Sequence, residues 1–101
     1  MNDHQIINKA LALAHRAHFT LFGVYCSDDF SFTGATSRAQ VKALFKKSKS
    51  GIRVIWSDPS GVRHWIDFPA NMACTIHVNS EHPHMVQVRD ELAAFIRRYR
   101  G

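Results

Sequence analysis

One segment constrains the fold more than any other, because it specifies a β-hairpin together with its register: residues 51–68, GIRVIWSDPSGVRHWIDF. Asp58, Pro59 and Gly61 stand where a type I turn that ends in a G1 bulge prefers these residue types. Such a turn pairs Asp58 with Val62, and the other pairs follow by counting outward. One face then collects the apolar residues and one histidine: Ile52, Val54, Trp56, His64, Ile66 and Phe68. The opposite face pairs residues of mixed character: Arg53 with Asp67, Ile55 with Trp65, and Ser57 with Arg63.

The spacing of apolar residues outside the hairpin predicts three helices and two further strands. Helices are expected over residues 1–19, over residues 37–50, and from Pro83 to the C-terminus. Strands are expected over residues 19–26 and 72–78, whereas residues 27–37 are rich in turn formers and are expected to form a loop. The fold class is therefore α+β, in the order α-β-α-β-β-β-α, with helices packed on an antiparallel sheet of three to four strands.

Size and composition favour one globular domain of 101 residues. Within it, residues 1–35 supply the N-terminal helix and strand, and residues 36–101 form a basic αβββα portion. The chain has only two cysteines and begins with no signal-peptide pattern, so a reducing cytoplasm is expected. No run approaches the roughly 18 apolar residues of a membrane span, so no membrane partner is expected. The oligomeric state is left open.

Positive charge is concentrated in the second part of the chain. Residues 1–35 hold two basic and three acidic residues, whereas residues 36–101 hold eleven basic and five acidic residues. The formal net charge of +5 favours an anionic partner, either a nucleic acid or an acidic protein surface. Four cations of the predicted second helix form one stripe, which either follows a phosphate backbone or is an ordinary solvated face: Arg38, Lys42, Lys46 and Lys49. Further candidate binding residues lie on the hairpin and near the C-terminus: Arg53, Arg63, Arg97 and Arg98.

The predicted pair of Ile55 and Trp65 lies on the hairpin face that also carries Arg53 and Arg63. Tryptophan beside arginine is suited to stacking on nucleobases or to anchoring a protein partner. Alternatively, the N-terminal helix and strand cover this face and bury Trp65 in the core. In that case Arg53 and Asp67 form only a modest cross-strand pair.

Seven histidines raise the question of a metal site or a catalytic site. No pair of His or Cys residues has the repeated spacing of a structural zinc site, so we expect neither a metal nor another cofactor. His64 shares the predicted core face with Trp56, which favours a buried histidine with a hydrogen-bond partner. A catalytic general base of a ribonuclease at His64 is the alternative.

Residues 36–99 resemble the αβββα layout of double-stranded-RNA-binding-like domains and, more narrowly, the HicA-type toxins, small RNA-cleaving proteins of bacterial toxin–antitoxin pairs. Three segments carry the resemblance, as a first helix, a second strand with a histidine, and a third strand that leads to the last helix: SRAQVKALFKK, SGVRHWIDF and CTIHVNSEHPH. The resemblance implies RNA binding and makes His64 the candidate catalytic residue. Those toxins place the catalytic histidine directly after Gly-Ser, whereas this chain has Ser60-Gly61-Val62-Arg63-His64.

Three functions are consistent with these observations. A small basic domain that binds nucleic acid, RNA more than DNA, explains the charge asymmetry and the Arg/Trp face. A small regulator or inhibitor, of the kind carried by phages or mobile elements, would use the same face against a host protein. A HicA-like His-dependent ribonuclease comes third, so we expect a binding protein rather than an enzyme.

Overall fold

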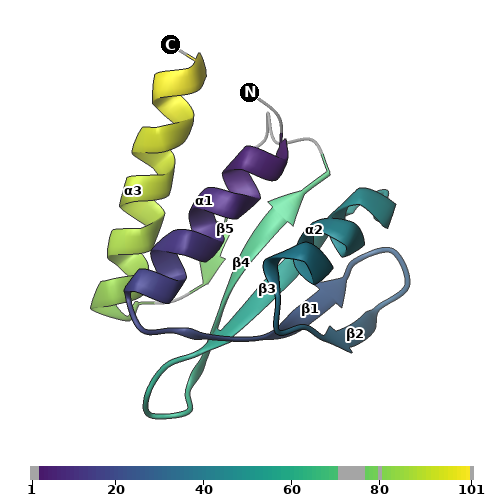
Figure 1. The fold of residues 1–101 in the computed structure, drawn as a ribbon, viewed down its shortest axis with the longest axis horizontal. Helices are drawn as coiled ribbons and strands as arrows, with labels where there is room; N and C mark the ends of the chain where they lie inside the picture. Colours follow the sequence, from purple (N-terminus) through teal and green to yellow (C-terminus); the bar gives the residue numbers. More distant parts are fainter. Residues whose placement is uncertain (1–2, 71–76, 80, 101) are drawn as a thin grey trace.

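The protein has an α+β fold, which confirms the predicted class. The helices and strands follow the predicted order with one additional strand, β2 (Ser31–Gly34), so the sheet has five strands instead of the expected three to four. The computed structural model describes residues 3–70, 77–79 and 81–100. Its elements are α1 (Asp3–Arg16), β1 (Thr20–Cys26), β2 (Ser31–Gly34), α2 (Arg38–Lys47), β3 (Gly51–Ser57), β4 (Arg63–Pro69), β5 (His77–Asn79) and α3 (Pro83–Arg100). The five strands form one antiparallel sheet in the order β2-β1-β3-β4-β5 (Figure 1).

The β3–β4 hairpin has the register that its sequence predicts, because residues 51–57 pair in reverse with residues 63–69. The Asp58 N–H donates to the Val62 carbonyl at 2.9 Å, and the Gly61 N–H donates to the Asp58 carbonyl at 2.9 Å. Gly61 has a φ of 85°, in the left-handed region that glycine adopts without steric cost. This turn therefore decides which face of the hairpin meets the core.

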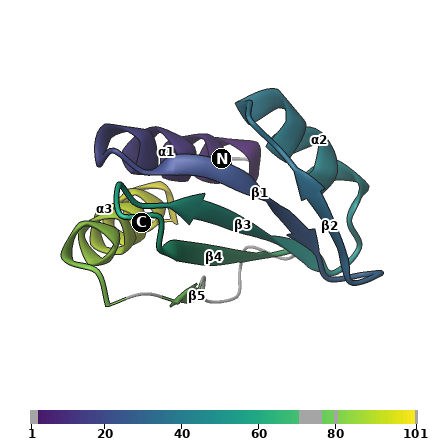
Figure 2. The same cartoon turned by 90° about the horizontal axis from the view of Figure 1, so that it is seen from below.

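The helices form a layer on one face of the sheet. Figure 1 shows α3, α1 and α2 side by side over the strands, and Figure 2 shows no described helix on the opposite side. The broad apolar sector of α1 is explained by its position, because α1 contacts both α2 and α3. The largest fully buried side chains fill the space between the two layers: Ile6, Ile7, Val24, Val41, Ile52, Val54, Trp56, Ile66, Phe68, Met85, Val88 and Leu92.

The helix α2 begins at the predicted capping box. The Gln40 N–H donates to the Ser37 hydroxyl at 3.3 Å, and the Ser37 N–H donates to the Gln40 side-chain oxygen at 3.1 Å. The helix ends at Lys47, slightly earlier than expected, where the Ser48 N–H donates to the Phe45 carbonyl. Val41 and Phe45 point into the core, as their helical spacing predicts.

The expectation of a loop over residues 27–37 is wrong in part, because this segment contains β2. The strand pairs with β1 and forms the edge of the sheet. The Asp28 carboxylate fixes the turn before β2 to the start of β3 by accepting the Lys49 and Ser50 N–H groups, both at 2.7 Å. The strand is only four residues long and is flanked by turn-forming residues, so the sequence pattern predicts a loop instead.

The predicted strand over residues 72–78 lies mostly outside the described residues. Only residues 77 and 78 of this predicted strand are described, and they belong to β5, which pairs with β4. In the part of the chain that the structure describes, no helix is both long enough and apolar enough to cross a lipid bilayer.

Candidate binding face of the sheet

The face of the sheet opposite the helices carries side chains that are only partly buried. On β3 and β4 these include Arg53, Ile55 and Trp65, and Tyr25 of β1 lies opposite Arg53. The helix α1 packs on the other face, and β1 extends the sheet beside β3 instead of covering it. This arrangement corrects the alternative in which the N-terminal elements bury Trp65 in the core.

A β-bulge adds an aromatic side chain to this face. The pairing of β1 with β3 shifts between Leu21 and Gly23, so Phe22 is an extra residue of the strand. The Phe22 ring lies 5.4 Å from the Phe32 ring of β2, measured between centres. The Phe32 ring in turn lies over Gly23, at a distance that leaves no room for a Cβ atom. Phe22 and Phe32 remain 36% and 48% exposed.

Two arginines of the hairpin stack on aromatic rings of the same face. The guanidinium carbon of Arg63 lies 4.0 Å from the centre of the Phe22 ring, and that of Arg53 lies 4.9 Å from the centre of the Trp65 ring. Asp67 positions Arg53, because its carboxylate oxygens accept hydrogen bonds from Arg53 Nε at 2.7 Å and from Nη2 at 3.2 Å. Arg63 belongs to none of the ion pairs formed by the described side chains.

The turn between β1 and β2 exposes a phenylalanine in an unfavourable backbone conformation. Phe30 is 77% exposed and has a φ of 56°, in the left-handed region that bulky residues avoid. Its ring centre lies 6.4 Å from that of Tyr25. We call the aromatic and arginine side chains of this side the aromatic–arginine face: Phe22, Tyr25, Phe30, Phe32, Arg53, Arg63 and Trp65.

The predicted cationic stripe belongs to a different part of the molecule. The helix α2 packs against the covered face of the sheet, so its cations border the helix layer. Lys42 is partly buried, whereas the other three cations of the stripe are exposed: Arg38, Lys46 and, just after the helix, Lys49. The aromatic–arginine face therefore does not include them.

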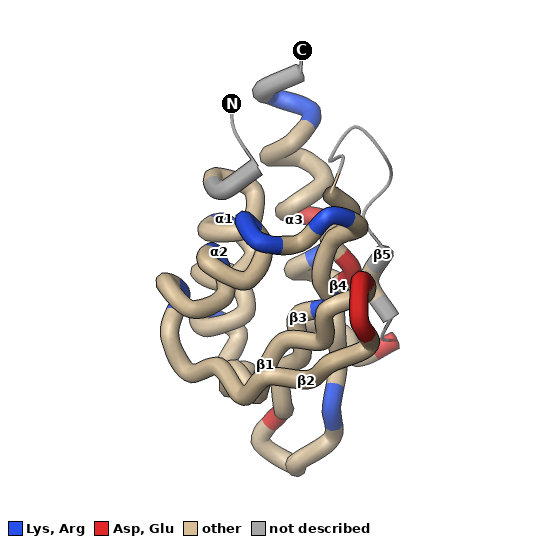
Figure 3. Tube along the Cα trace, turned by 90° about the vertical axis from the view of Figure 1, so that its right-hand side faces the viewer, with Lys and Arg blue, Asp and Glu red and all other residues tan. Residues whose placement is uncertain are grey.

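The remaining predicted cations, Arg97 and Arg98, are exposed near the C-terminal end of α3. Figure 3 shows Lys and Arg positions on α2, on the strands and at the end of α3, with neutral and acidic positions between them. Of the predicted binding residues, the structure thus brings Arg53, Arg63 and Trp65 together on one face.

His64 packs as a core residue, as the register predicts, and the structure pairs it with Asp58. Only 7% of His64 is exposed, and its Nε2 lies 3.0 Å from Asp58 Oδ2. Asp58 Oδ1 also accepts the backbone N–H groups of Ser60 and Val62 at 2.8 Å and 3.0 Å. The hydrogen bond with His64, followed by those from the backbone, lowers the pKa of the Asp58 carboxyl below its ordinary value. A catalytic role of His64 stays a prediction.

Histidines from distant segments meet near His64. The ring of His82 lies 5.3 Å from that of His64 and 5.4 Å from those of Phe19 and His84, measured between centres. Among the residues that the structure describes, no group of three or more His, Cys, Asp or Glu side chains is arranged to hold a metal ion.

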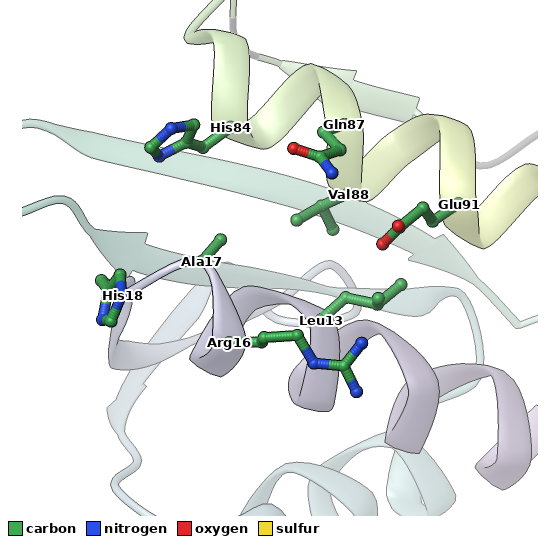
Figure 4. Close-up of a pocket in the computed structure, with 8 residues that line it drawn as sticks. All are labelled: Leu13, Arg16, Ala17, His18, His84, Gln87, Val88 and Glu91. Atoms are coloured by element: carbon green, nitrogen blue, oxygen red, sulfur yellow. The ribbon is translucent and has the colours of Figure 1, made fainter.

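A groove of about 230 Å³ lies between α1 and α3 (Figure 4). Its apolar lining consists of Leu13, Ala17 and Val88, and its polar lining consists of Arg16, His18, His84, Gln87 and Glu91. Figure 4 shows the two histidines at one end and the glutamate toward the other. Because the lining sets one arginine against one carboxylate, it lacks the uniform positive charge that attracts a phosphate backbone. We therefore place the candidate site on the aromatic–arginine face.

Four aromatic members of this face escaped the sequence reasoning: Phe22, Tyr25, Phe30 and Phe32. The strand FTLFGVYC reads as buried, and its bulge depends on pairing with β3, which no local pattern specifies. One local pattern does indicate exposed aromatic side chains: Phe30 and Phe32 follow two aspartates in a segment otherwise rich in turn formers.

No protein-family model, no curated protein and no solved structure matches this chain. The resemblance to HicA-type toxins accordingly remains one of layout.

Proposed function

We propose that this protein binds single-stranded RNA on the aromatic–arginine face. The observation that carries the proposal is the stack of Arg63 on Phe22, beside the partly exposed ring of Phe32, on a sheet face that none of the described helices covers. Aromatic rings stack on unpaired bases, and arginine adds a charge for the neighbouring phosphate. The proposal makes single-stranded RNA the preferred ligand, because the faces of bases inside a duplex are stacked on each other and cannot stack on protein side chains.

The charge of this face supports stacking as the main source of affinity. Arg53 is paired with Asp67, so Arg63 is the face's principal uncompensated cation. Binding of a single strand loses affinity with a slope of about −0.7 per phosphate contact in a plot of log K against log salt. With one or two such contacts, the expected slope lies between about −0.7 and −1.4. A steeper slope would indicate that the cations of α2 contribute most of the binding.

A pair of arginine variants tests the location of the site. Arg63→Ala removes a cation from the aromatic–arginine face, and Arg98→Ala removes the same charge from the exposed end of α3. With a fluorescein-labelled single-stranded oligouridine at low salt, anisotropy should show a roughly 2- to 5-fold loss of affinity for Arg63→Ala, the range of one exposed charge contact. Arg98→Ala should bind like the wild type, and a duplex RNA of equal length should bind more weakly than the single strand.

Two results would contradict the proposal. One is the absence of binding to any RNA at low salt. The other is equal loss of affinity for the two arginine variants, which would indicate a general effect of net charge. Aromatic and arginine side chains also anchor protein partners. A complex captured from lysate that survives nuclease treatment and is lost in Arg63→Ala would therefore support the alternative of a regulator that binds a host protein.

A further inference from the structure

We propose that Tyr25 and Phe30 form a slot that holds one unpaired nucleobase of the bound strand. The inference rests on the proposed function and adds to it a subsite for a single base. It begins from Phe30, a bulky and exposed residue in a left-handed backbone conformation.

The conformation of Phe30 is unfavourable, and packing does not offset it. A φ of 56° places the residue where glycine or asparagine usually stands. Because 77% of its surface is exposed, its ring contributes little to the core. Residues kept in sparsely populated backbone regions are concentrated at binding sites and active sites.

The turn around Phe30 is fixed from both sides. Asp28 accepts the Lys49 and Ser50 N–H groups, which connects the turn to β3. Asp29 Oδ1 accepts hydrogen bonds from the Ser31 hydroxyl at 2.6 Å and from the Ser31 N–H at 3.2 Å. The backbone therefore presents Phe30 in a defined place, while its exposed ring has room to turn.

The separation of the two rings suits a planar guest. The centres of the Tyr25 and Phe30 rings are 6.4 Å apart, with 58° between the ring planes. A base stacked between two rings needs about 7 Å, or twice the contact distance of about 3.5 Å between carbon atoms. To admit a base, the exposed Phe30 ring must turn toward the plane of Tyr25, and the two ring centres must separate from 6.4 Å to about 7 Å.

The surrounding charges favour a base in the slot and a phosphate outside it. Asp28 and Asp29 stand beside Phe30 in the turn, and hydrogen bonds from Lys49 and from Ser31, respectively, lower the pKa of each carboxyl, so both carry negative charge at neutral pH. A phosphate is repelled there, whereas an uncharged base is not. On the opposite side, Arg53 lies across from Tyr25 in the neighbouring strand. Because Asp67 already pairs with Arg53, this cation adds only a weak attraction for the adjoining phosphate.

The test uses the variants Phe30→Gly and Phe30→Tyr of the full chain, with labelled single-stranded oligouridine as the probe. Phe30→Gly relieves the left-handed conformation, so its unfolding midpoint should equal or exceed that of the wild type. Its affinity should fall by about 5- to 150-fold, which corresponds to the roughly 1–3 kcal/mol of one stacked base. Phe30→Tyr keeps the ring and should retain the affinity of the wild type.

A second probe reports stacking itself. An oligouridine that contains one 2-aminopurine should lose fluorescence on binding the wild type and lose less on binding Phe30→Gly. If the wild type binds single-stranded RNA and Phe30→Gly binds it equally well, the slot is wrong and the proposed function stands. If the wild type binds no RNA, the proposed function fails and the slot fails with it.

Discussion

Two hairpin turns of this protein each contain one residue in the left-handed backbone conformation, a glycine in one turn and a bulky phenylalanine in the other. Gly61 closes the β3–β4 turn with a φ of 85°, where glycine is the favoured residue. Phe30 stands in the β1–β2 turn with a φ of 56°, where a bulky residue is disfavoured. The first turn serves folding, and we attribute the second to binding.

Replacement of Gly61 tests the turn that sets the hairpin register. A Cβ atom at Gly61 meets nothing within 4 Å, so the only cost of Gly61→Val is the left-handed backbone. We expect a loss of about 1–3 kcal/mol in the free energy of unfolding, measured by urea denaturation. Gly61→Asn should lose less, because asparagine tolerates this region. Equal stability of Gly61→Val and wild type would argue against the G1 bulge.

The pair of Asp58 and His64 makes stability depend on pH. The folded-state pKa of Asp58 is lowered, chiefly by His64, so the folded protein holds this proton less tightly than the unfolded chain does. The resulting stabilisation is present above the unfolded pKa of about 3.9 and is lost as the pH falls through the lower folded pKa. Thermal unfolding between pH 6 and pH 2 should show this loss, and it should be smaller in Asp58→Asn. An identical pH profile for the variant would contradict the pairing.

At the scale of the elements, the sequence predicted those features of the strands that depend on residues close together in the chain. The β3–β4 register followed from Asp58, Pro59 and Gly61, since a turn type fixes all pairs beyond it. The bulge at Phe22 did not follow, because it exists only where β1 meets β3, far away in the sequence. The strand β2 was missed for a similar reason, since its four residues gain their strand conformation from pairing with β1.

Gly23 tests the contact between β1 and β2 that seats Phe32. A Cβ at Gly23 would collide with the Phe32 ring and with the Thr33 carbonyl oxygen, whereas a Cβ at its cross-strand partner Gly34 meets nothing within 4 Å. We expect Gly23→Ala to displace the ring and to cost about 1–3 kcal/mol, as overpacking does. Gly34→Ala, as the matched control, should unfold near the wild-type midpoint. Equal midpoints for the two variants would contradict the close approach of β2 to Gly23.

At the scale of the whole molecule, the decisive feature is the placement of the helices in one layer. Both faces of the β3–β4 hairpin carry a tryptophan, and the local pattern does not say which elements cover which face. The structure buries Trp56 under the helices and leaves Trp65 partly exposed beside Arg53. Net charge alone pointed to the cations of α2, whereas the assembled molecule places arginine next to aromatic rings on the sheet.

The two tryptophans provide the most direct measurement of the central claim. The partly exposed Trp65 side chain lies on the proposed binding face, and its buried indole nitrogen finds no hydrogen-bond partner among the described residues. Trp56 is 1% exposed and lies in the core. In ¹H–¹⁵N spectra titrated with single-stranded oligouridine, the Trp65 indole signal should shift together with backbone signals of β1 to β4, while the Trp56 indole signal should stay in place. Shifts confined to α2 and the end of α3, with an unmoved Trp65 signal, would contradict RNA binding on the aromatic–arginine face.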